Sequence, residues 1–302
     1  MEDSANSTCN TTALTKRSSV ILLGSLSSVS VVTCLVALLS VLCLRLYSKF
    51  LYRLAAYQVL ASLLHALVGV SQLTFIEYSE SKHVSCVVVG FMLQSATMMK
   101  LCLAGWITFH IFCFAVLFKN LTKLEPLYVI TSLAVPIALA TVPIATKSYG
   151  PTGEWCWIPS KKCGTLYPTG AIEQLVLNYA PLIMFLVLDS AVMLITLGTV
   201  YRRAHRNETD RDTEVFGRKQ NMMAFKQLLP LVAYPITFCI LVVPPLIYRA
   251  YREASSLPNP ELLVLSTVCI SAYSFSSGLT LIIHIAVVKL RNRGSQAGHH
   301  WA

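Results

Sequence analysis

The chain has 302 residues, of which 55% are hydrophobic and only 13% are charged. Soluble domains carry roughly 25% charged residues, so this composition excludes a soluble globular fold and indicates a membrane protein. The formal net charge is +10. It does not indicate a nucleic-acid partner, because the basic residues gather in alternate loops between apolar stretches, as is typical of membrane proteins.

The chain contains seven apolar stretches, each about long enough to cross a bilayer as a helix. Such a helix needs roughly 20 apolar residues to span ~30 Å of hydrocarbon. In chain order the stretches are 19–44, 54–78, 86–118, 127–146, 171–201, 223–248 and 261–287. We therefore predict an all-α fold. Its membrane domain of seven helices, 19–287, lies between a leader, 1–18, and a short tail, 288–302.

The distribution of charge predicts which side of the membrane each end occupies. With the N-terminus outside, fifteen Lys and Arg residues fall on the cytoplasmic side and eight on the outer side, in agreement with the positive-inside rule. Lys16 and Arg17, next to the first span, favour the opposite orientation. Asn6 and Asn10 begin two glycosylation sequons in the leader, which favour a leader outside the cell. We expect a multi-pass protein of the plasma membrane with a glycosylated outer leader and a cytoplasmic tail.

Polar and small residues recur on one face of three predicted helices. They are Gln58, Ser62, His65, Gly69 and Gln72 in the second; Gln174, Asn178, Pro181, Phe185 and Asp189 in the fifth; and Thr267, Ser271, Ser274 and Gly278 in the seventh. Because polar groups are costly in lipid, we expect these faces to turn towards the bundle interior. There they either join helices through small and polar contacts or line a cavity. We expect Gln72, Gln174 and Asn178, in the outer halves of their helices, to contact a ligand.

Two ionisable residues lie deep within predicted spans. Lys100 is ~21 Å from the outer start of the third helix and Asp189 is ~27 Å from that of the fifth, at 1.5 Å per residue. These similar depths permit a buried ion pair between Lys100 and Asp189, which would remove two isolated charges from lipid. The alternative hypothesis is that Lys100 forms the floor of a pocket for an anionic or carbonyl-bearing ligand.

Four cysteines fall outside the membrane in this topology: Cys9, Cys86, Cys156 and Cys163. An even set in an oxidising compartment favours disulfides. Cys156 lies between two tryptophans in the second outer loop, and Cys86 opens the third helix at the same membrane face. Pairing of Cys86 with Cys156 would pin this loop over the bundle, and Cys163 is the alternative partner of Cys86. Trp155 and Trp157 then either cap a cavity, with Trp157 as a ligand contact, or anchor the loop at the membrane interface.

Three features resemble the cyclic-AMP-receptor-like G-protein-coupled receptors. They are the cysteine that opens the third helix, the sequence Trp155-Cys156-Trp157-Ile158 and the run Lys-Gln-Leu-Leu-Pro-Leu-Val-Ala-Tyr-Pro at 226–235. This group is best known from slime moulds, is related to the secretin-type receptors and has orphan animal members. The resemblance implies a seven-transmembrane bundle of the G-protein-coupled-receptor type with a Cys86–Cys156 disulfide. It also implies that a heterotrimeric G protein binds at the inner ends of the third, fifth and sixth helices.

Other features keep further classes of function open. Thr108-Phe109-His110 stands in place of Asp-Arg-Tyr, which disfavours the rhodopsin-type class. Ser274–Gly278 lacks the Gln-Gly pair that cyclic-AMP and secretin-type receptors tend to carry. These missing activation motifs suggest the alternative of a receptor-shaped scaffold that does not signal. An intramembrane zinc hydrolase is a third hypothesis and a transporter a fourth. The residues that could serve a zinc site are His65, His110, His284 and Asp189. No pair among them has a metal-ligand spacing, so we expect neither enzyme activity nor a metal or cofactor.

Together these patterns predict a receptor that transduces an extracellular ligand to the cytoplasm. The ligand would enter beneath the Cys156 loop. Its expected contacts are Gln72, Lys100, Gln174, Asn178 and Trp157. Binding would favour a state in which the inner part of the sixth helix swings about Pro235. The basic inner loops would then meet a G protein or anionic lipid.

Overall fold

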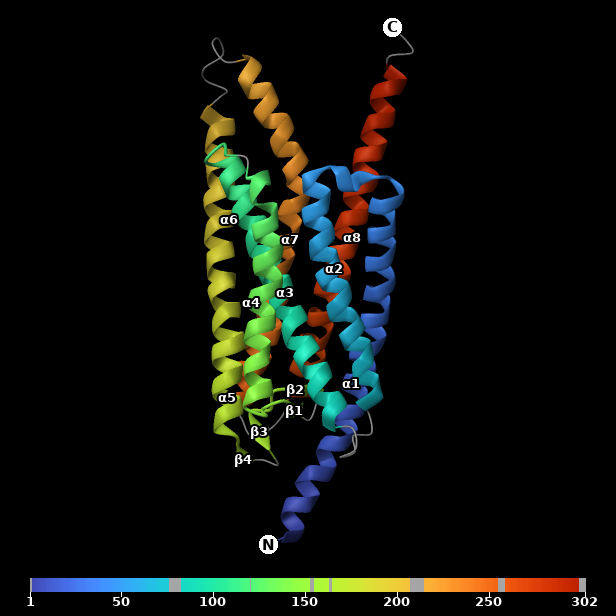
Figure 1. Cartoon of the computed structure of the whole chain (residues 1–302), viewed down its shortest axis with the longest axis vertical. Coiled ribbons are helices and arrows are strands. Elements are labelled where there is room, and N and C mark those ends of the chain that lie inside the picture. Colours follow the sequence, from blue (N-terminus) through green and yellow to red (C-terminus); the bar gives the residue numbers. More distant parts are fainter. Residues whose placement is uncertain are drawn as a thin grey trace.

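The structure is a computed structural model of the chain and describes residues 2–75, 83–119, 121–152, 155–162, 165–206, 215–254 and 259–298. Seven of its helices are long and apolar enough to cross a membrane, and they run side by side along the long axis of the molecule (Figure 1). The shortest apolar span has 22 residues, which corresponds to ~33 Å of helix. The predicted all-α seven-transmembrane bundle is therefore confirmed.

The helices have the following bounds: α1 Glu2–Cys43, α2 Phe50–Ser71, α3 His83–Ala115, α4 Glu125–Ala145, α5 Pro168–Gln174, α6 Ala180–Arg206, α7 Val215–Ala254 and α8 Pro260–Gly298. Short 3-10 turns lie at Leu46–Ser48 (η1), Gln72–Phe75 (η2) and Thr122–Leu124 (η4). Three helices continue beyond their apolar spans, which are Val20–Cys43 in α1, Leu231–Arg252 in α7 and Pro260–Lys289 in α8. The predicted leader thus has helical backbone from Glu2. The side chains of Cys9 and of the expected glycosylation sites Asn6 and Asn10 lie outside the described residues.

The fifth span is interrupted, which its sequence did not predict. Between α5 and α6 the chain forms a π-helical turn, η5 (Leu175–Tyr179). A π turn inserts an extra residue into the helix and shifts the faces on either side of it. Gln174, Asn178 and Asp189 are nevertheless all buried, so the polar stripe of the fifth span faces the bundle interior on both sides of the turn.

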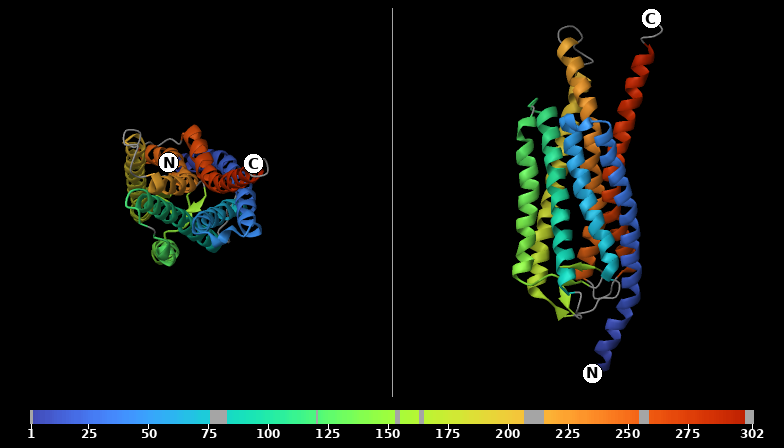
Figure 2. Two further views of the ribbon diagram at one scale, coloured as in Figure 1. Left: turned by 90° about the horizontal axis from the view of Figure 1, so that it is seen from above. Right: turned by 45° about the vertical axis from the view of Figure 1, so that its right-hand side comes forward.

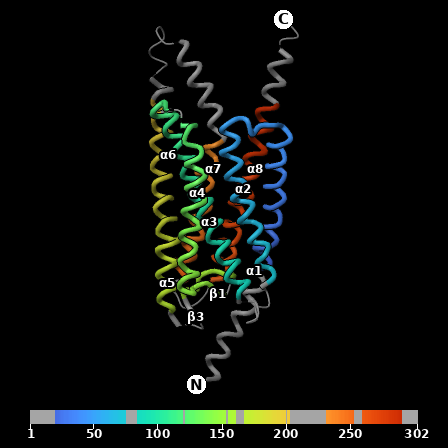
Figure 3. Tube along the Cα trace, in the orientation of Figure 1, coloured from blue at the N-terminus to red at the C-terminus, as the bar shows by residue number. Residues whose placement is uncertain are grey.

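Most of the packing between helices involves α3 or α8. α3 packs against α2, α4, α6 and α7, while α8 packs against α1, α2 and α7. α4 packs mainly on α3 and lies at the periphery (Figure 2). α1 and α6 lie on opposite flanks, as the Cα trace also shows (Figure 3). α1 begins at the end of the bundle that carries the strands, here called the loop end, and α8 ends at the opposite tail end (Figure 1).

Apolar and polar residues are distributed as expected for a bundle surrounded by lipid. Large apolar side chains are exposed on the outer faces, including Val32, Leu194 and Ile240. Gln58 is fully buried between helices, and its Nε2 donates to the hydroxyl of Tyr273 at 2.9 Å. A polar group facing lipid would lose its hydrogen bonds with water and gain none, so the interior is where such groups are stabilised.

The polar face of α8 holds α1 close. Ser30 Oγ donates to the carbonyl of Ser271 at 3.2 Å, and Cys34 Sγ lies 3.5 Å from the carbonyl of Ser274. At Gly278 an added Cβ would lie 3.1 Å from the backbone nitrogen of Cys34. Part of this face therefore joins two helices, in agreement with one of the two interpretations of the stripe.

The loop between α4 and α5, residues 146–167, forms two small hairpins across the loop end. β1 (Gly150–Pro151) pairs antiparallel with β2 (Cys156–Trp157), and β3 (Lys161–Lys162) pairs with β4 (Thr165–Leu166). Tyr149 anchors the start of the loop, because its hydroxyl donates to the carbonyl of Ala140 at 3.0 Å. Burial raises the pKa of this phenol, so it stays protonated and able to donate.

Candidate ligand-binding cavity

A disulfide fixes the α4–α5 loop over the bundle. Cys86 on α3 is bonded to Cys156 on β2, with a Cα–Cα distance of 5.2 Å, and both residues are buried. The predicted pairing of Cys86 with Cys156 is thus formed. Its alternative partner, Cys163, lies outside the described residues.

Two glutamines predicted to contact a ligand bind the backbone of the loop. The Cys156 backbone N–H donates to Gln72 Oε1 at 3.0 Å, and Gln72 Nε2 donates to the Cys156 carbonyl at 3.4 Å. Gln174 Nε2 donates to the carbonyl of Ile158. Neither glutamine belongs to the lining of the cavity beneath the loop. The prediction placed both at the correct end of the bundle but did not foresee that the backbone of the loop would occupy their hydrogen-bonding groups.

Trp157 turns inward from the loop and is fixed by a residue that sequence reasoning missed. Its Nε1–H donates to Gln94 Oε1 at 2.8 Å, and Gln94 Nε2 donates to the carbonyl of Leu177 in the π turn at 3.1 Å. Gln94 is buried on α3, where a single amide in an apolar helix was the available signal. The Gln94 amide thereby connects the loop, α3 and η5 at one point.

The cavity lies below this loop, in the loop-end half of the bundle, and has a volume of about 150 Å³. Its walls come from α1, α2, α3, η5, α6, α7 and α8, and Trp155 and Trp157 form its roof. Of the five predicted ligand contacts, three line it: Lys100, Asn178 and Trp157. Asn178 Oδ1 is buried and has no hydrogen-bond partner among the described residues.

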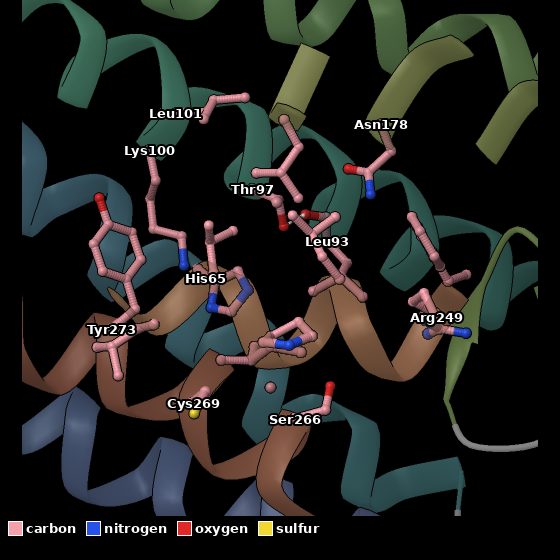
Figure 4. Close-up of a pocket in the computed structure, with 18 of the residues that line it drawn as sticks. His65, Leu93, Thr97, Lys100, Leu101, Asn178, Arg249, Ser266, Cys269 and Tyr273 are labelled. Carbon is pink, nitrogen blue, oxygen red and sulfur yellow. Dashed lines mark hydrogen bonds between the residues drawn. The ribbon is translucent and has the colours of Figure 1, made fainter. Parts of the chain in front are cut away.

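Lys100 forms the deep end of the cavity. Its Nζ donates to Ser274 Oγ at 3.3 Å and lies 5.0 Å from the centre of the Tyr273 ring. His65 Nδ1 is also 3.3 Å from Ser274 Oγ. In the close-up, the Lys100 side chain extends from α3 towards His65 and Tyr273 (Figure 4). The polar stripes of α2 and α8 therefore meet α3 at Lys100.

Arg249 lies at the other end of the cavity, beside the roof (Figure 4). Its guanidinium carbon is 5.0 Å from the ring centre of Trp155 and 5.4 Å from that of Trp157. Such cation–π contacts hold a guanidinium in place. In the sequence Arg249 is one of the eight basic residues counted on the outer side, with no role of its own predicted.

The predicted ion pair between Lys100 and Asp189 is not formed. Asp189 lies beside the hydroxyl of Thr108, which is eight residues beyond Lys100 on α3 and therefore ~12 Å nearer the tail end. The ion pair that the described residues do contain is between Arg53 and Glu125. Residue counts from uncertain helix starts gave Asp189 too shallow a depth, and they contain no information about the direction in which a side chain points.

The Arg53–Glu125 pair joins α2 to the start of α4 near the tail end. Arg53 Nε and Nη2 donate to the two carboxylate oxygens of Glu125 at 2.7 and 2.5 Å, and the Tyr57 hydroxyl donates to Oε1 at 2.9 Å. Arg53 Nη1 also donates to the carbonyls of Tyr47 and Ser48 in the preceding turn. This two-point contact with a carboxylate is the geometry that an Arg side chain favours.

The histidines proposed as zinc ligands have other neighbours. The His110 ring lies 4.8 Å from the Phe50 ring and the His284 ring stacks at 4.9 Å on Tyr52, while His65 faces Ser274. Within the described residues no three His, Cys, Asp or Glu side chains come together as a metal site.

The bundle has seven spans, a cavity lined by residues from six of them, and a disulfide-bonded loop as its roof. This is a seven-transmembrane bundle of the G-protein-coupled-receptor type. The sequence profile of the slime mold cyclic AMP receptor family matches residues 8–295. The chain therefore belongs to that family, as the resemblance implied. None of the individually curated proteins matches the chain.

Proposed function

We propose that this multi-pass membrane protein is a cell-surface receptor that converts the binding of an extracellular ligand into activation of a heterotrimeric G protein. The observation that carries the proposal is the cavity: it lies under a covalently fixed loop, and α7 contributes one of its walls. A ligand in this cavity contacts both a rigid roof and the helix whose tail-end part would move. Catalysis has no part in this function.

The proposed orientation places the loop end outside the cell. The Cys86–Cys156 disulfide favours this side, because disulfides persist in the oxidising extracellular compartment. The excess of basic residues in the loops of the tail end favours the cytoplasm for that end. The leader, with its sequons at Asn6 and Asn10, would then be outside and glycosylated.

Transmission to the tail end would pass through α7. Phe238, Leu241 and Val242 line the cavity, and Pro235 lies one turn further towards the tail end. Proline removes a backbone hydrogen bond from the helix and permits a bend. A ligand that fits the cavity better when α7 is bent would increase the population of that state. The basic tail-end loops would then bind the G protein, with anionic lipid as a second partner.

The test is a panel of G-protein dissociation sensors, one for each G-protein class, in cells that express the full chain. We expect basal or tissue-extract-evoked signal for at least one class. Cys156→Ala should reduce this signal because the roof is released. Cys43→Ala, which removes an exposed cysteine outside the disulfide, should leave it unchanged. Surface expression is measured in parallel. If no G-protein sensor responds although expression is normal, the proposal is overturned in favour of a non-signalling scaffold.

A further inference from the structure

The cavity combines an apolar wall with charge of a single sign. Apolar side chains from α1, α3, α6, α7 and α8 form most of its lining, among them Leu101, Phe238 and Ile270. The charged side chains among the described residues that line it are both basic, Lys100 and Arg249. In a site of low dielectric, a bound anion would compensate the charge of Lys100, whereas a cation would be repelled.

Lys100 is the poorly compensated member of the pair. Its side chain is only 4% exposed, and an ammonium carries three N–H donors. Among the described residues it has one hydrogen bond, the 3.3 Å contact with Ser274 Oγ, in addition to the face of Tyr273. A buried ammonium with so few partners is costly, and a carboxylate at this point would remove much of that cost.

Only a short stretch of apolar wall separates Lys100 from Arg249. Trp157 is bonded to Gln94, six residues before Lys100 on α3, so the roof at which Arg249 lies is ~9 Å from the level of Lys100. A cavity of about 150 Å³ with apolar walls is large enough for a molecule of about the size of benzene. The space between the ends therefore fits a compact apolar group with one polar head.

We propose that the ligand is a small amphipathic carboxylate, whose anionic head binds at Lys100 beside His65 and Ser274 and whose apolar body lies against α7 and α8. Arg249 lies at the other end of the site, against the two tryptophans of the roof. This inference rests on the proposed function, in that the cavity is the ligand site. It separates this chain from recognition of a cyclic nucleotide, whose ribose and base carry polar groups that the apolar wall cannot pair.

The test measures binding to the purified full chain in lipid nanodiscs, without any G protein, at neutral pH. The probes are benzoate, phenylacetate and hexanoate, each compared with its neutral primary amide. We expect each acid to bind at least about tenfold more tightly than its amide, because a charge-assisted hydrogen bond in a buried site is involved. Equal affinities of acid and amide, or no binding of either to folded protein, would overturn the inference.

Variants locate the head group. Lys100→Met keeps the length of the side chain and should abolish the preference for acids, while Lys123→Met, which changes an exposed lysine, should keep it. If Lys100→Met does not fold, the comparison of acid and amide on the unaltered chain still decides the matter. Preference for acids without any signal in the G-protein panel would contradict the receptor function alone, and signal without that preference would contradict the ligand class alone.

Discussion

Gln72 on the last turn of the second span and Cys156 on the α4–α5 loop exchange two hydrogen bonds, one in each direction, next to the disulfide that ties the same loop to α3. Cys156 is thus held from two sides, by a covalent bond to α3 and by an amide from η2, the turn that follows α2. The roof of the cavity is consequently a fixed reference against which α7 can move.

Gln72→Leu should destabilise the protein by about 1–3 kcal/mol, because it leaves the buried N–H and carbonyl of Cys156 without partners. The melting temperature of the purified protein measures this effect. Thr141→Val is a matched control, since the exposed Thr141 hydroxyl bonds only within its own helix. If Gln72→Leu behaves like this control, the amide does not hold the loop.

Trp157→Phe keeps an aromatic ring in the roof but removes the Nε1–H that donates to Gln94. The buried Gln94 Oε1 would lose its partner, at a cost of about 1–3 kcal/mol in stability. The double variant Trp157→Phe/Gln94→Leu should recover part of this loss, because both polar groups are then absent. A thermal-unfolding cycle over the four proteins measures the coupling, and simple additivity would contradict the contact.

Gly278→Ala should destabilise the bundle by about 1–3 kcal/mol through overpacking, since its Cβ would meet the α1 backbone at Thr33 and Cys34. Gly198→Ala is the control, because an added Cβ there has no neighbour within 4 Å. We expect Gly198→Ala to be neutral or stabilising, as Ala has the higher helix propensity. Equal melting temperatures of the two variants would show that α1 and α8 are not closely packed.

The Arg53–Glu125 contact should show a coupling energy of about 1 kcal/mol in a double-mutant cycle with alanine, because its geometry is two-pronged but the arginine is partly exposed. Arg53→Lys should behave almost like Arg53→Ala, since an ammonium cannot reproduce the fork. Chemical denaturation in detergent, at low and at high salt, provides the measurement. If Arg53→Lys is as stable as the unaltered protein, the contact depends on charge alone and not on the fork geometry.

The architecture was predictable because hydropathy is a local property of the sequence. Each span requires only about 20 consecutive apolar residues, so the number of helices, their order and the placement of Lys100 inside the membrane could be read directly from the chain. The Trp155-Cys156-Trp157 motif and the resemblance attached to it likewise predicted the disulfide and the family. These features do not depend on how the helices are rotated about their axes.

The tertiary structure decided which polar groups meet. Lys100 contacts Ser274 rather than Asp189. This depends on how each helix is rotated, on the π turn at Leu175–Tyr179 and on the path of the α4–α5 loop. The same features also determine that Gln72 and Gln174 bind loop backbone. A change of one residue in a helix turns a side chain by about 100°, and an error of a few residues in a predicted boundary therefore leaves its direction undetermined. The sequence alone thus determined a seven-helix membrane protein with a pinned loop, whereas the positively charged apolar cavity between Lys100 and Arg249 arose only from packing.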